Sequence, residues 1–192
     1  MNNNNIKKHF TEHKKVLEIL LDNKVFQKKI EDSAKLIIKA FSKSGKLMIA
    51  GNGGSAADAQ HIAAEFIGKL NLKRKALPAI ALTTDTSILT CISNDYHFNQ
   101  IFFRQIQGIG KSGDVFLAIT TSGKSKNILE AIKLSKKKKI KIIVLTGKNG
   151  KFLEKYTNVC IPIPSSNTQT IQEMHIIILH IICDLIEQNI KR

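Results

Sequence analysis

The 192-residue sequence contains few cysteines and few acidic residues. Its three cysteines, Cys91, Cys160 and Cys183, are odd in number and lack the close spacing of metal-binding pairs. A disulfide framework and a cysteine-based metal site are therefore not predicted. Free thiols are typical of a reducing compartment, so we expect a cytoplasmic protein.

Long hydrophobic runs are also missing. The first ten residues contain no apolar segment of the kind found in secretory signals. The most apolar stretch, 176–186, is too short to span a bilayer and contains His180 and Asp184. We therefore expect a buried helix or an oligomer interface there, and no membrane partner.

The shortage of acidic residues leaves a strong positive charge. Lys and Arg number 30 against 15 Asp and Glu, so the formal net charge is +15. Such an excess attracts anions, including sugar phosphates, nucleic acid and acidic partners, or it reflects only a bias toward Lys, Ile and Asn. No arginine-rich arm or aromatic-interleaved basic strip is present, so nucleic acid is not predicted as a partner.

The pattern of apolar segments predicts one α/β domain over residues 1–192. Residues 1–45 have helical periodicity and are expected to pack on the domain or on a neighbouring subunit. Helices are also expected over 98–109 and near 168–190, and Ser166 with Gln169 has the spacing of a capping box before the latter. The lysines at 136–139 are expected at a helix end, where cations suit the dipole. Five short apolar runs alternate with helical segments, which indicates a parallel sheet buried on both faces. These runs cover 47–50, 78–82, 115–119, 140–145 and 159–163, and the prolines of the last indicate a sheet edge.

The first of these strands leads into a glycine-rich loop. Residues 51–54 read Gly-Asn-Gly-Gly, and Ser55 with Asp58 has the spacing of a capping box at a helix start. A strand, a glycine loop and a helix N-terminus in that order form an anion site. A phosphate is the expected occupant.

Nucleotide-binding motifs fit this chain poorly. Residues 51–56 match G-x-G-x-x-A, but the acidic residue expected about 20 positions later is missing. The Gly-Lys-Ser triplets at 110–112 and 123–125 lack the upstream glycine of a phosphate-binding P-loop, because Gln105 and Ala118 occupy those positions. Neither NAD binding nor a Walker motif is favoured.

A second loop, residues 120–125, reads Thr-Thr-Ser-Gly-Lys-Ser between a strand and a helix. It is either ordinary loop and cap chemistry or a second phosphate site. Because carboxyl ends of parallel strands share one edge of the sheet, the two loops together favour a sugar phosphate.

Three side chains could carry chemistry beside these loops. His61 and Glu65 are four residues apart on the first loop's helix, so they form a metal-ligand pair, an acid/base pair or a surface contact. His180 lies within an apolar helix. It is expected to be buried, either as a satisfied core residue or as a ligand.

Taken together, these segments resemble the bacterial phosphoheptose isomerases, a family with the SIS (sugar isomerase) fold. The resemblance covers nearly the whole chain. It is carried by residues 51–55, 58–61, Glu65, 94–95, 120–123 with Ser125, 145–147, 171–175 and His180. The family more often has Ser-Thr-Ser where this chain has Thr120-Thr121-Ser122, and the hydroxyl is retained.

The resemblance implies a three-layer αβα sandwich around a central five-stranded parallel sheet. It also implies conversion of sedoheptulose 7-phosphate to D-glycero-D-manno-heptose 7-phosphate, the first step toward activated heptose for lipopolysaccharide or capsule. The implied assembly is a homotetramer with active sites between subunits and one zinc ion per site. The implied zinc ligands are His61, Glu65, Gln172 and His180. The implied substrate contacts are Asn52, Gly53, Gly54, Ser55, Glu65, Asn94, Asp95, Thr120, Thr121, Ser122, Ser125 and Gln172.

Two hypotheses refine this picture. Glu65 is expected to act as the base and His180 as the acid of an enediol mechanism. Gln172 and His180 are about 12 Å apart along one helix. If both bind one metal, we therefore predict that they come from two different chains.

Two other functions remain open. A branch of the fold that associates with replication initiators resembles a tetramer that binds a protein partner, but it lacks the pair matching Glu65 and His180. Regulators or isomerases acting on amino-sugar phosphates share the fold, and the heptose-type metal set argues against that alternative.

Overall fold

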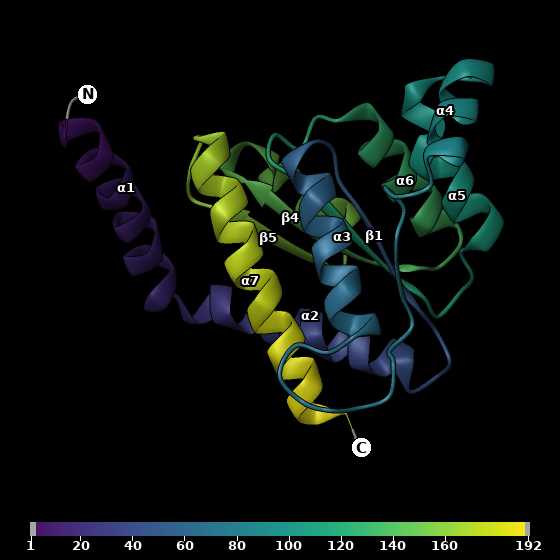
Figure 1. Ribbon diagram of the computed structural model, residues 1–192, viewed down its shortest axis with the longest axis horizontal. Helices are drawn as coiled ribbons and strands as arrows, with labels where there is room; N and C mark the ends of the chain where they lie inside the picture. The colour runs from purple at the N-terminus through teal and green to yellow at the C-terminus, as the bar shows by residue number, and fades with distance from the viewer. Residues whose placement is uncertain (1–2, 191–192) are drawn as a thin grey trace.

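A computed structural model describes residues 3–190 and contains a parallel five-stranded sheet. The strand order is β2-β1-β3-β4-β5, and every neighbouring pair is parallel (Figure 1). The predicted α/β fold with a buried parallel sheet is therefore confirmed. The strands are β1 (Leu47–Ala50), β2 (Ala79–Ala81), β3 (Val115–Thr120), β4 (Lys141–Gly147) and β5 (Val159–Ile163).

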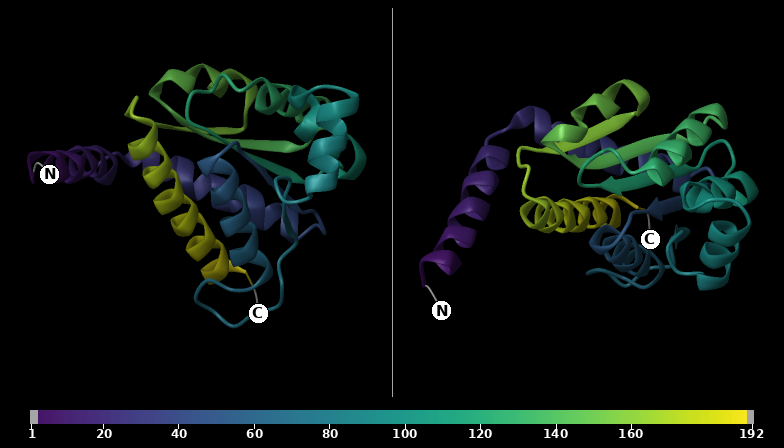
Figure 2. Two further views of the ribbon diagram at one scale, coloured as in Figure 1. Left: turned by 45° about the horizontal axis from the view of Figure 1, so that its top comes forward. Right: turned by 90° about the horizontal axis from the view of Figure 1, so that it is seen from above.

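Helices cover both faces of the sheet and give the expected three layers (Figure 2). Alternate residues of β3 show why: Leu117 packs into the core on one face, and Phe116 and Ala118 pack into the core on the other. The first face carries α2 (Lys24–Phe41), α3 (Gly54–Ile67) and α7 (Thr168–Asn189), and the second carries α4 (Thr86–Asp95), α5 (Ile101–Ile109) and α6 (Lys126–Lys137).

Helix α1 (Asn3–Leu21) projects away from this three-layered body (Figure 1). Its side chains Val16 and Leu20 are buried against the rest of the chain, while Phe10 is 74% exposed. A helix with apolar residues exposed at its outer end has an unpaired apolar face.

The position of the last strand agrees with the edge predicted from its prolines. β5 forms one edge of the sheet and contains Pro162, as predicted from its missing backbone N–H group. The lysines predicted at a helix end also lie there, since Lys136 and Lys137 occupy the last turn of α6.

Both predicted capping boxes are wrong. α3 begins at Gly54, with Gly53 as a cap that uses no side chain, and Ser55 is buried inside the first turn. Gly53 has φ +57°, a backbone conformation that residues with a Cβ atom rarely adopt. This conformation lets the helix begin at Gly54, directly after the loop. α7 is capped by Asn167, which accepts a hydrogen bond from the Gln169 N–H group, rather than by Ser166.

Two short 3₁₀ segments complete the chain. Phe98–Gln100 precedes α5, so the single helix expected over 98–109 is divided. Lys148–Tyr156 follows β4 and was not predicted.

Helix α7 is a core helix. It is long and apolar enough to cross a membrane by length and composition, but half of its most apolar window is buried. Ile178, Ile182 and Ile186 belong to the core shared with α2 and α3. This burial agrees with the expectation of a buried helix, and it is how core helices of soluble proteins behave.

Candidate functional site

The two predicted anion loops lie side by side at the carboxyl edge of the sheet. β1 and β3 are adjacent, with Ala50 paired to Ala118, and each loop follows directly from its strand. The side-chain amides of Asn52 and Asn127 exchange two hydrogen bonds, of 3.0 and 2.8 Å, between the first loop and the start of α6. Asn127 is almost fully buried. The loops therefore form one connected surface.

The first loop approaches α7 closely. A Cβ atom at Gly54 would lie 2.5 Å from Nε2 of Gln172. Gln172 therefore packs against the backbone where α3 begins, and a larger residue at position 54 would require the Gln172 side chain to move.

The second loop uses part of its hydroxyls to hold its own shape. Thr120 Oγ1 accepts a hydrogen bond from the Gly123 N–H group, and Ser122 Oγ accepts one from the Lys124 N–H group. Ser125 caps α6 without a side-chain hydrogen bond, so its hydroxyl is available to a ligand. Thr120 is buried and shapes the loop, and its contact with substrate stays a prediction.

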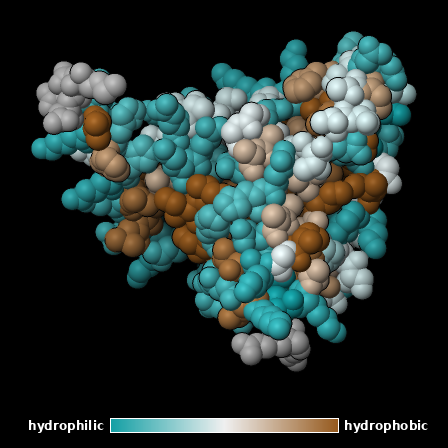
Figure 3. Space-filling view, in the orientation of Figure 1, coloured by the Kyte–Doolittle hydropathy of each residue, from teal (hydrophilic) through white to brown (hydrophobic). Residues whose placement is uncertain are grey.

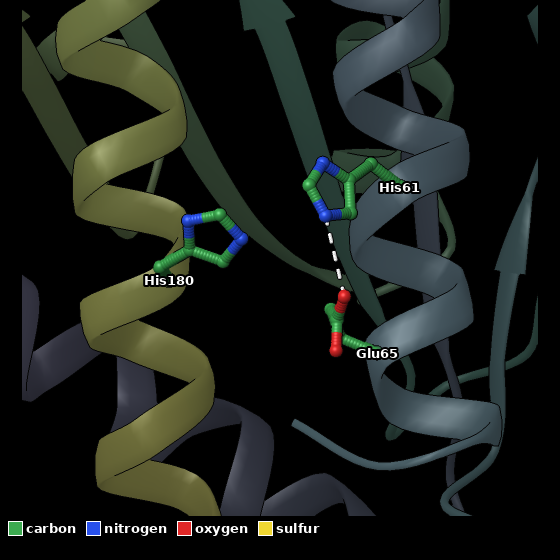
Figure 4. Close-up of side chains that lie close together, drawn as sticks. All are labelled: His61, Glu65 and His180. Carbon is green, nitrogen blue, oxygen red and sulfur yellow. Dashed lines mark ion pairs between the residues drawn. The ribbon is translucent and has the colours of Figure 1, made fainter. Parts of the chain in front are cut away.

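His61, Glu65 and His180 form a cluster between α3 and α7 (Figure 4). Nε2 of His61 lies 3.2 Å from Oε1 of Glu65. The rings of His61 and His180 meet edge to face, with centroids 4.9 Å apart. One ligand atom from each of the three residues can be chosen so that all lie within 4.8 Å of one another. Two imidazoles and a carboxylate are a donor set that suits zinc.

The structure places Gln172 apart from this cluster along the helices. α3 and α7 run side by side in the same direction (Figure 1). Gln172 lies against Gly54, and the His180 ring contacts the His61 ring. Gly54 and His61 are separated by about 10 Å along α3. The prediction that Gln172 and His180 reach one metal from two chains is not tested by a single chain and stays a prediction.

Asn94 and Asp95 end α4, on the other face of the sheet. Both are exposed, and the Asn94 amide donates a hydrogen bond of 2.9 Å to the Asp95 carboxylate. Within residues 3–190 no hydrogen bond joins either residue to the two loops. Their role in substrate binding stays a prediction.

Asp58 lies within α3 near the cluster and does not form the capping box that its spacing from Ser55 predicted. It lies one turn before His61, and one of its carboxylate oxygens is buried without a hydrogen bond from any residue in 3–190. Burial raises its pKa, and the positive charge of His61 offsets part of that rise. The sequence analysis assigned Asp58 to a capping box and so did not place it near the cluster. Its spacing of three residues from His61 does put both side chains on one helix face.

Cys183 lies on α7 between the cluster and the end of the helix. It is buried, and burial, followed by the nearby carboxylates of Glu65 and Glu187, raises its pKa to about 12. It is therefore a neutral thiol near neutral pH, which agrees with the free cysteines expected from the sequence.

Comparisons with known proteins identify the relatives of this chain. The SIS domain family matches residues 9–147. A phosphoheptose isomerase of Sulfurimonas denitrificans is 46% identical over 185 residues, which cover 96% of this chain and 93% of that protein.

Solved structures agree. The phosphoheptose isomerase of Francisella tularensis superposes with a TM-score of 0.93 at 34% identity, covering 98% of this chain and 100% of that one. That of Neisseria gonorrhoeae gives a TM-score of 0.89 at 38% identity, covering 97% and 98% of the two chains. The chain therefore belongs to the SIS domain family and, within it, to the phosphoheptose isomerases.

Proposed function

We propose that this protein converts sedoheptulose 7-phosphate to D-glycero-D-manno-heptose 7-phosphate. The observation that carries the proposal is the cluster of His61, Glu65 and His180 next to two anion loops on one sheet edge. A phosphate held at the loops places a sugar chain along α3 and α7, where the cluster lies. Membership of the isomerase family supports the same reaction.

The chemistry requires a base and an acid. The ketose loses a proton from C1 while its carbonyl oxygen O2 gains one, which gives the enediol. The aldose forms when C2 gains a proton and O1 loses its own. Glu65 is the proposed base, because a carboxylate can accept a carbon-bound proton within reach of its oxygens. His180 is the proposed acid, because an imidazole donates a proton near neutral pH. The two side chains face one another across the helix pair (Figure 4).

Zinc is the proposed metal of this cluster. His61, Glu65 and His180 would hold it, with Gln172 of a neighbouring chain as the fourth ligand. When bound, a zinc ion polarises sugar oxygens or holds the site together.

The phosphate is proposed to bind at the two loops. Its contacts would come from backbone N–H groups of the first loop and from hydroxyls of the second, at the N-termini of α3 and α6. The proposed contacts are Asn52, Gly53, Gly54, Ser55, Thr120, Thr121, Ser122 and Ser125, joined on the sugar by Glu65, Gln172, Asn94 and Asp95.

The proposed assembly is a homotetramer with active sites between subunits. An apolar groove runs between α1, α2 and α7, and Figure 3 shows the corresponding hydrophobic surface next to α1. A second copy of the chain is the proposed occupant, because the groove joins the helix that carries Gln172 and His180. The groove is lined by residues that include Phe10, Leu17, Leu21, Phe26, Ile177 and Ile181.

In the cell, the enzyme is proposed to act in the cytoplasm on the path to nucleotide-activated heptose for lipopolysaccharide or capsule. The single proposed domain covers residues 1–192, and residues 1–45 pack partly on a neighbouring subunit. The free cysteines support a cytoplasmic location, because free thiols are typical of a reducing compartment.

An isomerase assay on metal-stripped protein tests the proposal, with sedoheptulose 7-phosphate and with or without added zinc. We expect the aldoheptose phosphate to form and its rate to depend on zinc. Turnover that does not depend on zinc contradicts the proposed metal site and still supports the isomerase activity. Binding of the sugar phosphate without turnover contradicts the enzyme and favours the partner-binding alternative.

Glu65→Gln tests the assignment of the base. We expect turnover to fall by at least about a hundredfold while substrate still binds, since a general base contributes about 10²–10⁴-fold. Glu130→Gln is the matched control, because Glu130 is a partly exposed carboxylate that pairs with Lys133 on α6, away from the cluster. Near-normal turnover in Glu65→Gln rejects the assignment.

A further inference from the structure

A buried ion pair lies at the far end of the two helices that carry the cluster. Nε of Arg74 is 2.9 Å from Oε1 of Glu187, and the two side chains are only 6% and 1% exposed. Arg74 belongs to the loop after α3, and Glu187 belongs to the last turns of α7. A buried pair of this kind must be well satisfied by further partners to be retained.

The carboxylate of Glu187 is fully engaged. It accepts hydrogen bonds of 2.9 Å from the backbone N–H groups of Leu70, Asn71 and Leu72. Burial alone raises the pKa of Glu187, but these three N–H groups and Arg74 together hold it below its ordinary value. Glu187 thus ties α7 to the backbone of the loop that leaves α3.

Arg74 holds the other helix directly. Its Nη2 donates a hydrogen bond of 2.7 Å to the carbonyl oxygen of Glu65, and its Nη1 donates one of 2.8 Å to that of Phe66. These carbonyls belong to the last turn of α3, which has no helical partners for them. The guanidinium therefore joins the backbone of Glu65 to the side chain of Glu187 on the neighbouring helix.

The positions along both helices fit this connection. Glu187 follows His180 by seven residues, which is two turns, so both side chains lie on the same face of α7 at about 10 Å separation. That face meets α3, since the His180 ring contacts His61. One end of this contact holds the cluster and the other holds the ion pair.

We propose that Arg74 and Glu187 are positioning residues that set the spacing of α3 and α7 and thereby the geometry of His61, Glu65 and His180. Neither residue touches the substrate or the metal in this scheme. Their effect passes through the backbone carbonyl of Glu65 and through α7. The inference rests on the proposed function insofar as the cluster is taken to bind zinc.

Zinc affinity of the metal-stripped protein, measured by competition with a chromophoric chelator, tests the proposal. Outer-shell partners of metal ligands typically contribute 10–100-fold to affinity. We expect Glu187→Gln to weaken zinc binding by about tenfold or more. Arg74→Lys keeps the charge but loses the planar guanidinium, which donates to four backbone carbonyls, those of Glu65 and Phe66 among them, while it contacts the Glu187 carboxylate. Its zinc affinity should therefore lie between those of wild type and Glu187→Gln. Arg74→Lys also tests the proposal if Glu187→Gln does not fold.

Asp114→Asn is the matched control. Asp114 is also fully buried and binds the Lys46 ammonium at 2.6 Å and the backbone N–H groups of Lys46 and Lys111, but it lies at the amino ends of β1 and β3. We expect this variant to lower Tm while its zinc affinity stays within about twofold of wild type. Equal weakening by both variants, or unchanged zinc affinity in Glu187→Gln, overturns the proposal.

A readout without metal separates this inference from the proposed zinc site. In protein carrying ¹³C-labelled histidine, the ring signals of His61 and His180 are assigned by replacing each with Asn. We expect Glu187→Gln to shift both signals in the metal-free protein and Asp114→Asn to leave them in place. If wild type binds no zinc, the proposed metal fails while this comparison still decides the inference. Unmoved signals in Glu187→Gln reject it.

Discussion

Asn52 and Asn127 hold one another through both of their side-chain amides. The Asn52 amide donates to Asn127 at 3.0 Å, and the Asn127 amide donates back at 2.8 Å. Asn127 Oδ1 also accepts from the backbone N–H group of Ile128, at the first turn of α6. The pair connects the glycine loop after β1 to the helix that follows the hydroxyl-rich loop.

Asn127→Ala should loosen the first loop and weaken phosphate binding. It leaves the amide of Asn52 without its partner, and a lost buried partner costs about 1–3 kcal/mol. We expect KM for the sugar phosphate to rise by about tenfold with a smaller change in kcat, measured by steady-state kinetics.

The control for this variant is Asn158→Ala. Asn158 Oδ1 accepts a hydrogen bond from the Ile142 N–H group at the amino end of β4, away from both loops. It should change stability without changing KM. The proposed role of Asn127 is rejected if the two variants have the same KM.

Gly54→Ala should displace Gln172. The added Cβ atom would lie 2.5 Å from Nε2 of that side chain, which is closer than any allowed contact. We expect kcat/KM to fall by at least about tenfold, because the start of α3 and Gln172 both belong to the proposed site. Gly108→Ala is the control, since a Cβ atom there meets nothing within 4 Å. That variant should keep full activity and be at least as stable as wild type, because Gly108 lies in the last turn of α5, where alanine is a better helix former than glycine.

His175 should make the protein less stable in mild acid. Its side chain is fully buried, and burial lowers its pKa to about 4, which the Thr146 backbone offsets only in part. Below pH 6.5 the unfolded chain takes up a proton at this residue, and the folded chain does so only near pH 4. This stabilisation is complete above pH 6.5 and declines by up to about 1.4 kcal/mol per pH unit toward pH 4.

Urea unfolding between pH 7.5 and 4.5 measures this effect. His175→Asn lacks the titrating group, so its free energy of unfolding should fall less steeply with acid than that of wild type. Comparing slopes separates titration from any constant loss of stability that the substitution causes. Parallel slopes for the two proteins contradict the prediction.

Phe10→Glu should dissociate the proposed tetramer. Phe10 is 74% exposed on α1 and lines the apolar groove against α7. A carboxylate buried there without a partner is strongly unfavourable. Sedimentation velocity should show a smaller species at micromolar concentration. Ile109→Glu, an exposed apolar position at the end of α5, is the control and should keep the wild-type assembly.

Local sequence patterns were sufficient for most of the fold. Runs such as Leu47–Ala50 are short, wholly apolar and followed by glycine-rich turns, which is the pattern expected of strands buried on both faces. Pro162 identified the edge strand because proline lacks an N–H group. Both predicted capping boxes were wrong, because Gly53 rather than Ser55 is the N-cap of α3 and Asn167 rather than Ser166 is the N-cap of α7.

The candidate site was predictable only where its members are neighbours in sequence. Spacing alone put His61 and Glu65 on one helix face, and the glycine loop is visible as a motif. Adding His180 required the family resemblance, since it lies more than 100 residues away. Asn127, Arg74 and Glu187 had no such signal, because their partners come from other segments of the chain.

The sequence by itself determined the parallel α/β fold, the two anion loops and the kinds of side chain available for catalysis, because these depend on residues within a few turns of one another. The tertiary structure decided which side chains from distant segments of the chain contact one another. It set α7 alongside α3, so that His180 contacts His61 and Glu187 binds Arg74. It also joined the two loops through Asn52 and Asn127. Packing and hydrogen-bond geometry select such pairs only after the sheet and its helices have assembled.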